Sequence, residues 1–173
     1  MTTTPNAAPT AAQAHAEGEI EVLTFELQGE IFALEATLVR EILDMSPLTA
    51  VPGAQRFASA VINFRGKVIP LADLRIAFGM PAEAATIDSR IVVIEIVIDG
   101  TPTLVGLLTD RVHEVTTLDL SNSEPPPSIG MRWRPDYIRC LVKRSGQFVI
   151  LPSLDNIFAS PKRGSKPQLV TAA

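Results

Sequence analysis

Cysteine, histidine and aromatic residues are scarce in this chain of 173 residues. It has one Cys, two His, one Trp, one Tyr and seven Phe. A disulfide framework needs at least two cysteines, and a zinc site needs three or four nitrogen, sulfur or oxygen ligands. The scarcity therefore argues against both kinds of site, and we expect the chain to use no metal and no cofactor.

Charge and hydropathy narrow the class of protein further. The chain has 15 basic and 19 acidic side chains and a net charge of −4, which argues against a general surface for nucleic-acid phosphates. Charges interrupt the apolar runs well before the roughly 20 residues of a membrane span, and the N-terminus lacks the apolar core of a signal peptide. A hydrophobic fraction of 46% is too high for a disordered chain. We expect a soluble, intracellular globular protein.

Two short tails flank the part of the sequence that is patterned for folding. Residues 1–18 contain Pro5 and Pro9 and no apolar stripe, so we expect a disordered tail there. Residues 161–173 are rich in basic and small side chains and predict a flexible tail. Residues 19–160 remain as the folded part, a length that allows one compact domain or two small, closely packed ones.

Alternation of apolar and polar residues dominates the folded part and predicts a mainly β chain. Asp99-Gly100 is typical of a hairpin turn. We expect strands over residues 23–27, 31–34, 59–64, 67–71, 91–98, 103–109, 112–116, 137–143 and 147–151. Helical spacing is confined to three short segments, residues 35–42, 72–78 and 153–158.

The pattern recurs along the sequence at fixed offsets. Residues 60–78 align without a gap on residues 140–158, 80 positions later, and Gly66 then meets Gly146. Two shorter matches accompany this one, residues 23–29 with 94–100 and residues 39–42 with 112–115. Two copies are too few for a solenoid, and they fit two β-barrels of about five strands each, because closure removes exposed strand edges. The alternative is a chance similarity between β-hairpins.

Several segments resemble the CheW-like domain family. Residues 51–53 (Val-Pro-Gly) and 60–75, with the motif Asn63-x-Arg65-Gly66, look like the signature of that family. Residues 105–115 and 137–158 are similar to the matching second-half segments. The resemblance covers roughly residues 20–160 and implies two interleaved, five-stranded SH3-like β-barrel subdomains packed together, with a few short helices. This fold agrees with the repeat found from the sequence itself.

The resemblance also implies a function. CheW-like proteins are non-enzymatic adaptors that couple the cytoplasmic tips of methyl-accepting chemoreceptors to the histidine kinase CheA. In the family, a groove between the barrels receives the helical receptor tip, and the first barrel contacts the regulatory domain of the kinase. We therefore expect a cytoplasmic protein at receptor arrays on the inner face of the membrane. The alternative is a CheW-like scaffold of another receptor–kinase pathway, serving surface motility or development.

Matching the family motif gives seven candidate partner-binding residues. They are Val39, Glu41, Ala60, Asn63, Arg65, Ile91 and Gly106. Ala60 and Cys140 stand where the family usually has Gly, and each adds a Cβ where close approach of the backbone can matter. Pro152 replaces a usual acid or Asn. The apolar members of the set have a second interpretation as ordinary core residues.

Arg65 precedes the turn glycine of a predicted hairpin, so its guanidinium can project from the barrel. Its five fixed donors suit a carboxylate, either in a partner or in the same chain. By resemblance to the family motif, Glu41 is the intramolecular candidate. An ordinary hairpin arginine that holds its own loop is the alternative, and the two interpretations are compatible.

Charge is uneven along the chain. Residues 17–64 have a balance of −6 and residues 131–144 a balance of +4. Such polarity can orient a molecule between unlike partners and speed their encounter. The alternative is a solvated surface with uneven charges. Trp133, between two arginines of the basic segment, is expected either to stack in an interface or to close one barrel.

An enzyme is the weakest interpretation of the sequence. Its best case is Asp110 with His113 and a serine such as Ser121. Residues three apart on a strand point to opposite faces, and no nucleophile elbow, P-loop or paired metal-ligand spacing is present. Cys140 lies in an apolar strand, where a thiol is usually inert. We expect no catalytic residues.

Overall fold

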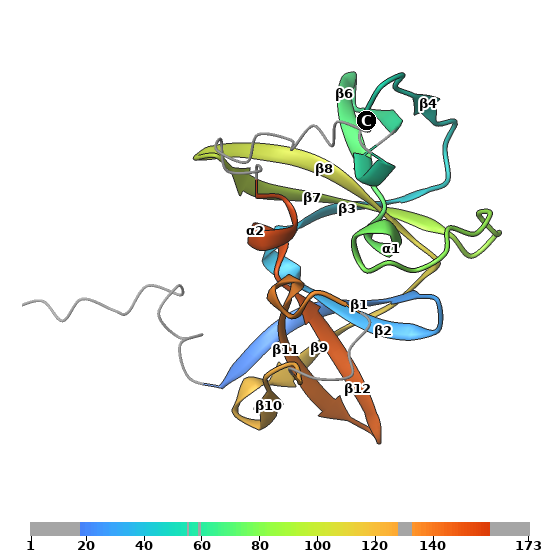
Figure 1. The fold of residues 1–173 in the computed structure, drawn as a ribbon. Helices are drawn as coiled ribbons and strands as arrows, with labels where there is room; N and C mark the ends of the chain where they lie inside the picture. Colours follow the sequence, from blue (N-terminus) through green and yellow to red (C-terminus); the bar gives the residue numbers. More distant parts are fainter. Residues whose placement is uncertain (1–17, 55, 59, 128–132, 160–173) are drawn as a thin grey trace, which may run out of the picture.

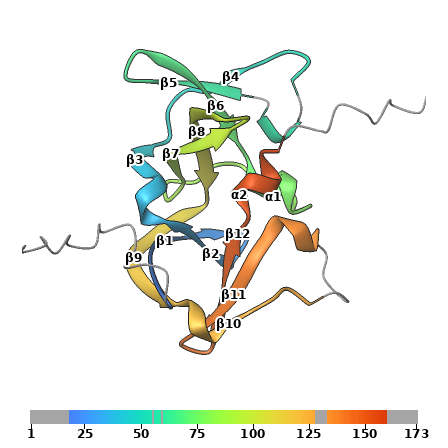
Figure 2. The ribbon, with the colours of Figure 1, turned by 90° about the vertical axis from the view of Figure 1, so that its left-hand side faces the viewer.

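The computed structural model describes residues 18–54, 56–58, 60–127 and 133–159. Over these residues, twelve strands form two sheets, and the prediction of a mainly β protein is confirmed. The two predicted tails lie almost wholly outside the described residues. Figures 1 and 2 show the two sheets one above the other, as two subdomains.

Subdomain A is the sheet with the order β10-β11-β12-β2-β1-β9. Its strands are β1 (Glu19–Leu27), β2 (Glu30–Glu35), β9 (Arg111–Asp119), β10 (Ser123–Glu124), β11 (Ile138–Arg144) and β12 (Gln147–Pro152). Subdomain B has the order β3-β7-β8-β6-β5-β4. Its strands are β3 (Val39–Asp44), β4 (Thr49–Ala50), β5 (Ala60–Phe64), β6 (Lys67–Ala72), β7 (Arg90–Ile98) and β8 (Thr101–Thr109).

Each sheet has five longer strands, the number expected for each barrel, and one more at its edge; nine of these ten longer strands were predicted individually, and β3 was not. The additional strands, β4 and β10, are two residues long, which is too short for the alternation pattern to reveal. The helices are also short. They are α1 (Leu74–Ala77), α2 (Leu154–Ile157) and the 3₁₀ turns η2 (Ala36–Leu38), η3 (Arg56–Ala58), η4 (Leu120–Asn122) and η5 (Pro135–Tyr137).

The internal repeat is confirmed and extends through both subdomains. Residues 67–72 of β6 and 74–77 of α1 lie 80 positions before 147–152 of β12 and 154–157 of α2. The two sheets have the same strand order once each strand is matched to its repeat equivalent, β9 to β3, β1 to β7, β2 to β8, β12 to β6, β11 to β5 and β10 to β4. The parallel pair occupies the same place in both, as β12 with β2 and β6 with β8. The two subdomains are therefore copies of one architecture.

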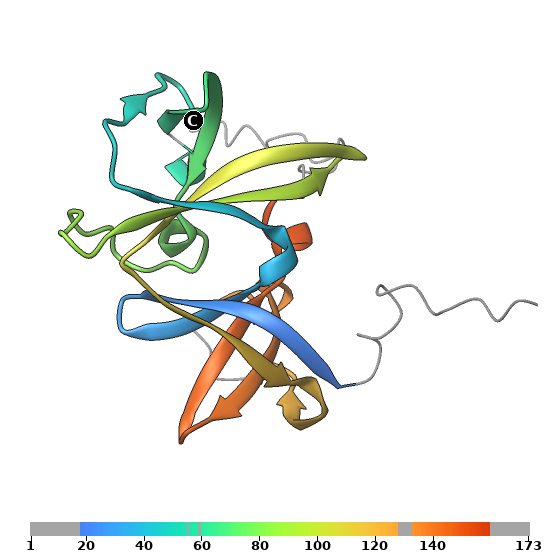
Figure 3. The same ribbon diagram turned by 180° about the vertical axis from the view of Figure 1, so that it is seen from behind.

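The copies exchange hairpins. The first repeat supplies hairpin β1–β2 to subdomain A, where it pairs with β9 and β12 of the second repeat. The second repeat supplies hairpin β7–β8 to subdomain B, where it pairs with β3 and β6 of the first. The chain crosses between the sheets at η2 and again at Asp110, between β8 and β9 (Figures 1 and 3). Each sheet therefore combines strands from both halves of the sequence.

The helix predicted over residues 35–42 is wrong. A single 3₁₀ turn ends at Leu38, and the chain continues as β3 with alternating half-buried and exposed residues. Leu38, Val39 and Ile42 fit a helical spacing as well as part of a strand, and sequence alone did not show that β7 offers an edge for pairing. Because tertiary pairing outweighs local propensity, this segment forms a strand.

Aromatic rings join the two subdomains. Phe78, at the end of α1, packs on Phe32 of β2 with ring centroids 5.1 Å apart, and on Trp133 at 5.4 Å. Two further ring pairs cross between the repeats, Phe57 with Phe158 at 5.2 Å and Phe78 with Tyr137 at 6.5 Å. These two pairs are repeat equivalents, because residues 57 and 78 lie 80 positions before 137 and 158. Through its contact with Phe78, Trp133 belongs to the aromatic cluster at the junction between the subdomains.

Gly106 of β8 lies in the core of subdomain B rather than at a surface. A Cβ added there would lie 3.0 Å from Ile91 Cγ2 and 3.2 Å from both Ile62 Cδ1 and Leu71 Cδ1. Contacts this short force neighbouring side chains to move. The missing Cβ therefore lets the strand pack closely against these three side chains.

We predict that Phe32→Ala lowers the free energy of unfolding by about 3–5 kcal/mol, because the ring is fully buried at the subdomain junction. The matched control is Phe148→Ala, a ring 45% exposed, which is expected to change stability by less than about 0.5 kcal/mol. Urea unfolding measures both. Equal losses would contradict the assignment of Phe32 to the shared core.

We predict that Gly106→Ala costs about 1–3 kcal/mol through overpacking. Ile62→Val removes one of the crowded atoms, Cδ1, so the double variant should recover part of the loss. Thermal and urea unfolding of the three variants check this. A single variant as stable as the parent would show that the core accommodates a methyl group at this position.

Candidate functional site

All seven candidate residues lie in subdomain B. Val39 and Glu41 are on β3, Ala60 and Asn63 on β5, Arg65 in the β5–β6 turn, Ile91 on β7 and Gly106 on β8. Arg65, Asn63 and Glu41 reach the surface, and Val39 and Ala60 are half-buried. Ile91 is fully buried, as Gly106 is. Those two support the strands from inside, so direct contact with a partner is not assigned to them.

The predicted pair of Arg65 and Glu41 is present. Arg65 Nη2 lies 2.9 Å from Glu41 Oε2, and Nε donates to the same oxygen at 3.1 Å. Arg65 and Gly66 both have positive φ, as a tight hairpin turn requires, and the amide of Gly66 donates to Asn63 Oδ1 at 3.1 Å. The Arg65 side chain is nevertheless 74% exposed. The guanidinium is therefore oriented by the turn and by Glu41 while its outer side faces solvent.

A cavity adjoins this pair, and we call its lining together with Arg65 and Glu41 the hairpin surface. A cavity of about 280 Å³ is lined by Arg40, Phe64, Arg65, Lys67, Glu95 and Leu104. Exposed apolar residues of the same subdomain include Ile42 on β3 and Val68 on β6. Charged and apolar groups side by side on exposed strands are typical of a protein-docking surface.

Subdomain A carries an equivalent arrangement that the sequence did not reveal. Arg144 Nη1 lies 2.9 Å from Glu114 Oε1, and Glu114 is the repeat equivalent of Glu41. Val115 and Phe148 are exposed at the positions equivalent to Ile42 and Val68. The adjoining cavity, of about 390 Å³, is lined by Thr24, Ile31, His113, Glu114, Arg144, Ser145, Gln147 and Val149. The alignment hid the pair because Arg144 is displaced by one position from the equivalent of Arg65.

A groove lies between the subdomains, beside α2 and η2. Its volume is about 310 Å³, and it is lined by Ala33, Leu34, Glu35, Leu38, Ile96, Val97, Arg139, Leu151, Pro152, Ser153, Leu154 and Asp155. Val97 is 61% exposed at this groove, while Arg139 Nη1 lies 2.7 Å from Glu35 Oε1. The resemblance implied a groove between the subdomains, and a cavity is present there. Pro152, one of the departures from the family pattern, is part of its lining.

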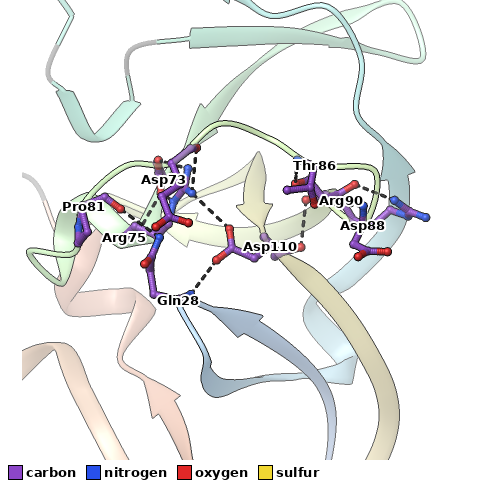
Figure 4. A network of polar contacts seen from close by, with 11 residues as sticks. Gln28, Asp73, Arg75, Pro81, Thr86, Asp88, Arg90 and Asp110 are labelled. Atoms are coloured by element: carbon purple, nitrogen blue, oxygen red, sulfur yellow. Dashed lines mark hydrogen bonds and ion pairs between the residues drawn. The ribbon is translucent and has the colours of Figure 1, made fainter.

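A buried arginine of α1 occupies the other side of the junction (Figure 4). Arg75 is 3% exposed. Its Nε and Nη2 each lie 3.0 Å from an oxygen of Asp73, and its Nη1 lies 3.2 Å from Asp110 Oδ1 and from the carbonyl oxygen of Glu83. The second oxygen of Asp110 accepts the amide of Gln28 at 2.7 Å. We call this network the Arg75 clamp.

The clamp is a strong polar contact between elements. Hydrogen bonding to the Asp73 carboxylate raises the pKa of Arg75 above its ordinary value. Among the described side chains, no buried nitrogen or oxygen lacks a hydrogen-bond partner. Burying a guanidinium is costly unless its donors are satisfied, and here the two aspartates and one carbonyl satisfy them. Sequence reasoning missed Arg75 because nothing local to it identifies Asp110 as its second partner.

The proposed catalytic grouping does not assemble. Asp110 bonds Arg75 and Gln28, whereas His113 Nε2 lies 3.1 Å from Glu26 Oε2. Ser121 Oγ donates to Asp119 instead, at 2.6 Å. Burial raises the pKa of the Cys140 thiol, which disfavours the nucleophilic thiolate. The described residues contain no group of three or more His, Cys, Asp or Glu side chains placed to hold a metal.

The charges that are uneven along the sequence are not segregated between the subdomains. The acidic segment is divided between the sheets, since β1 and β2 belong to subdomain A and β3 to subdomain B. The basic strand β11 shares a sheet with the acidic hairpin β1–β2, and Arg139 pairs with Glu35. Charges that are far apart in sequence therefore pair with each other.

No helix in the described part of the chain is long and apolar enough to cross a membrane.

Proteins with similar sequences and structures carry one family description. The family profile for the CheW-like domain matches residues 21–162. The chain is 30% identical over 153 residues to "Chemotaxis protein CheW" of Rhizobium meliloti, covering 88% of this chain and 96% of that protein. It is also 30% identical over 144 residues to the protein of the same name from Thermotoga maritima, covering 80% and 87%.

The fold agrees with a solved structure. The crystal structure of scaffolding protein TtCheW from Thermoanaerobacter tengcongensis matches with a TM-score of 0.72 and 30% identity, covering 84% of this chain and 92% of that one. The expectation of two β subdomains drawn from the family resemblance is confirmed. With the matched profile spanning the folded part of the sequence, the chain belongs to the family of CheW-like domains.

Proposed function

We propose that this protein is a non-enzymatic adaptor that couples methyl-accepting chemoreceptors to the histidine kinase CheA. The observation that carries the proposal is that two separate hollows lie on one molecule, a groove between the subdomains and the cavity of the hairpin surface on subdomain B. An adaptor must bind two partners at once, and separate surfaces permit this. The relatives named chemotaxis protein CheW and the scaffolding protein of known structure support the assignment.

The groove suits the receptor tip. An amphipathic helix binds by placing apolar side chains, three or four positions apart, into an apolar groove. Leu38, Ile96 and Val97 supply apolar surface here. The Glu35–Arg139 pair and the exposed Asp155 provide polar groups beside it, which can fix the register of a bound helix.

The hairpin surface suits the regulatory domain of the kinase. Arg65 is held by Glu41 and keeps donors available on its outer side, so it can bind a carboxylate of the partner. Ile42 and Val68 add exposed apolar area. The family resemblance implies that the regulatory domain of the kinase shares this fold. The equivalent surface on subdomain A would then bind a second regulatory domain, and alternating contacts of this kind would build rings. We place the protein in the cytoplasm, at receptor arrays on the inner face of the membrane.

Simultaneous binding tests the proposal directly. We expect the purified chain to form a ternary complex with a chemoreceptor signalling fragment and a CheA regulatory-domain fragment, detected by size-exclusion chromatography with light scattering. Binding to each fragment alone gives the two binary controls. If the chain binds neither fragment, the adaptor proposal fails, and fragments from a motility or developmental receptor–kinase system become the next ones to measure.

We predict that Arg65→Ala weakens binding to the kinase fragment by roughly tenfold, the effect of losing one charge-assisted contact of about 1.4 kcal/mol. The melting temperature should stay close to that of the parent, because an exposed ion pair contributes little to stability. Arg134→Ala is the matched control, since Arg134 also forms an exposed pair, with Asp136. A melting temperature that falls together with binding would assign Arg65 a structural role alone.

A further inference from the structure

The two sides of the subdomain junction are repeat equivalents but are filled differently. Residues 73–75, which begin α1, correspond to residues 153–155, which begin α2. We call the line along which the subdomains meet on each side of the junction a crease. On the α1 side, Arg75 and Asp73 lie in this crease. On the α2 side, the equivalent residues are Asp155 and Ser153, and both line the open groove. One crease is thus closed by a buried arginine, and the other is hollow.

The chain crosses between the two sheets twice, once on each side of the junction. The crossing at Asp110 lies in the Arg75 clamp, where Asp110 bonds Arg75 of subdomain B and the Gln28 amide in the β1–β2 turn of subdomain A. The other crossing is η2, and its last residue, Leu38, lines the groove. Phe78 and Phe158, which end α1 and α2, take part in the aromatic pairs that cross the junction. Figure 1 places α1 and α2 on opposite sides of this junction.

We propose that Arg75 is a positioning residue that sets the opening of the groove from the opposite side of the molecule. The clamp connects the subdomains at the α1 crease, and aromatic rings at the ends of α1 and α2 pack across the same junction. A change of angle at one crease therefore alters the width of the other, as in a hinge between two packed bodies. This inference rests on the proposed function, because it takes the groove as the binding site of the receptor helix.

The clamp has the properties that such a role requires. Arg75 holds Asp73 through two donors, and this fork fixes the orientation of its guanidinium. The remaining nitrogen of the guanidinium, Nη1, then faces Asp110 and the carbonyl oxygen of Glu83. A buried ion pair is sensitive to geometry, since losing one partner leaves a charge with little compensation. The angle between the subdomains is therefore held at one value rather than a range.

Spin labels measure this angle without any partner. We would place labels on Thr101→Cys in subdomain B and Lys143→Cys in subdomain A, in a Cys140→Ala chain so that no other thiol is present. Both positions are exposed and lie outside the groove lining and the clamp. In Arg75→Met we expect the distance distribution to shift or broaden by double electron–electron resonance. The matched control is Arg111→Met, next to Asp110, which loses only an exposed pair with Asp88.

Binding is the second readout. If the competent opening of the groove falls to about one tenth of the population, the Kd for the receptor fragment rises about tenfold. The Kd for the kinase fragment should be unchanged, because the hairpin surface lies within subdomain B and does not depend on the angle. A role of Arg75 in folding alone would lower both affinities together with the melting temperature.

The outcomes separate this inference from the proposed function. A folded Arg75→Met chain with the distances of the parent, or with the parent's Kd for the receptor fragment, overturns the clamp proposal. If Arg75→Met does not fold, Asp110→Asn decides, because it keeps the Arg75–Asp73 pair and removes one acceptor from the contact between the subdomains. If the parent itself does not bind the receptor fragment, the proposed function fails, while the label distances still test whether the clamp sets the angle.

Discussion

The structure depends on the exchange of hairpins between the two repeats. Subdomain A is complete only with β1–β2 of the first repeat, and subdomain B only with β7–β8 of the second. The backbone groups of each hairpin are satisfied by strands of the other repeat, and unpaired strand edges in the core would be costly. Neither half of the sequence can therefore bury its own core, and the two subdomains form one folding unit.

The exchange also explains why the docking features come in related pairs that are not identical. Equivalent strands present Glu41 with Arg65 and Glu114 with Arg144 at opposite ends of the molecule. At the junction, the same equivalence places a buried arginine in one crease and a hollow in the other. Small changes at matched positions, such as Arg75 against Asp155, are enough to give a doubled architecture two distinct faces.

Sequence patterns predicted much of this arrangement and failed for identifiable reasons. Alternation and turn glycines placed β5–β6–α1 and β11–β12–α2 with ends within two residues of those observed, because these signals are local. The pair of Glu41 with Arg65 came from the family resemblance. Residues 35–42 were misassigned, and the Arg75–Asp110 contact was missed, because both depend on partners that are distant in the sequence. Ile91 and Gly106 lie in the core, which is the second interpretation that their apolar character allowed.

The hairpin exchange has a consequence for how such a chain can be built. A single repeat has β1–β2 but lacks a hairpin that fits beside its own β3 and β6. It could complete a sheet only by taking the hairpin of another copy, which is the geometry of a domain-swapped dimer with two-fold symmetry. The present chain has the geometry of such a dimer joined into one polypeptide, and its two halves differ at Arg75 and Asp155.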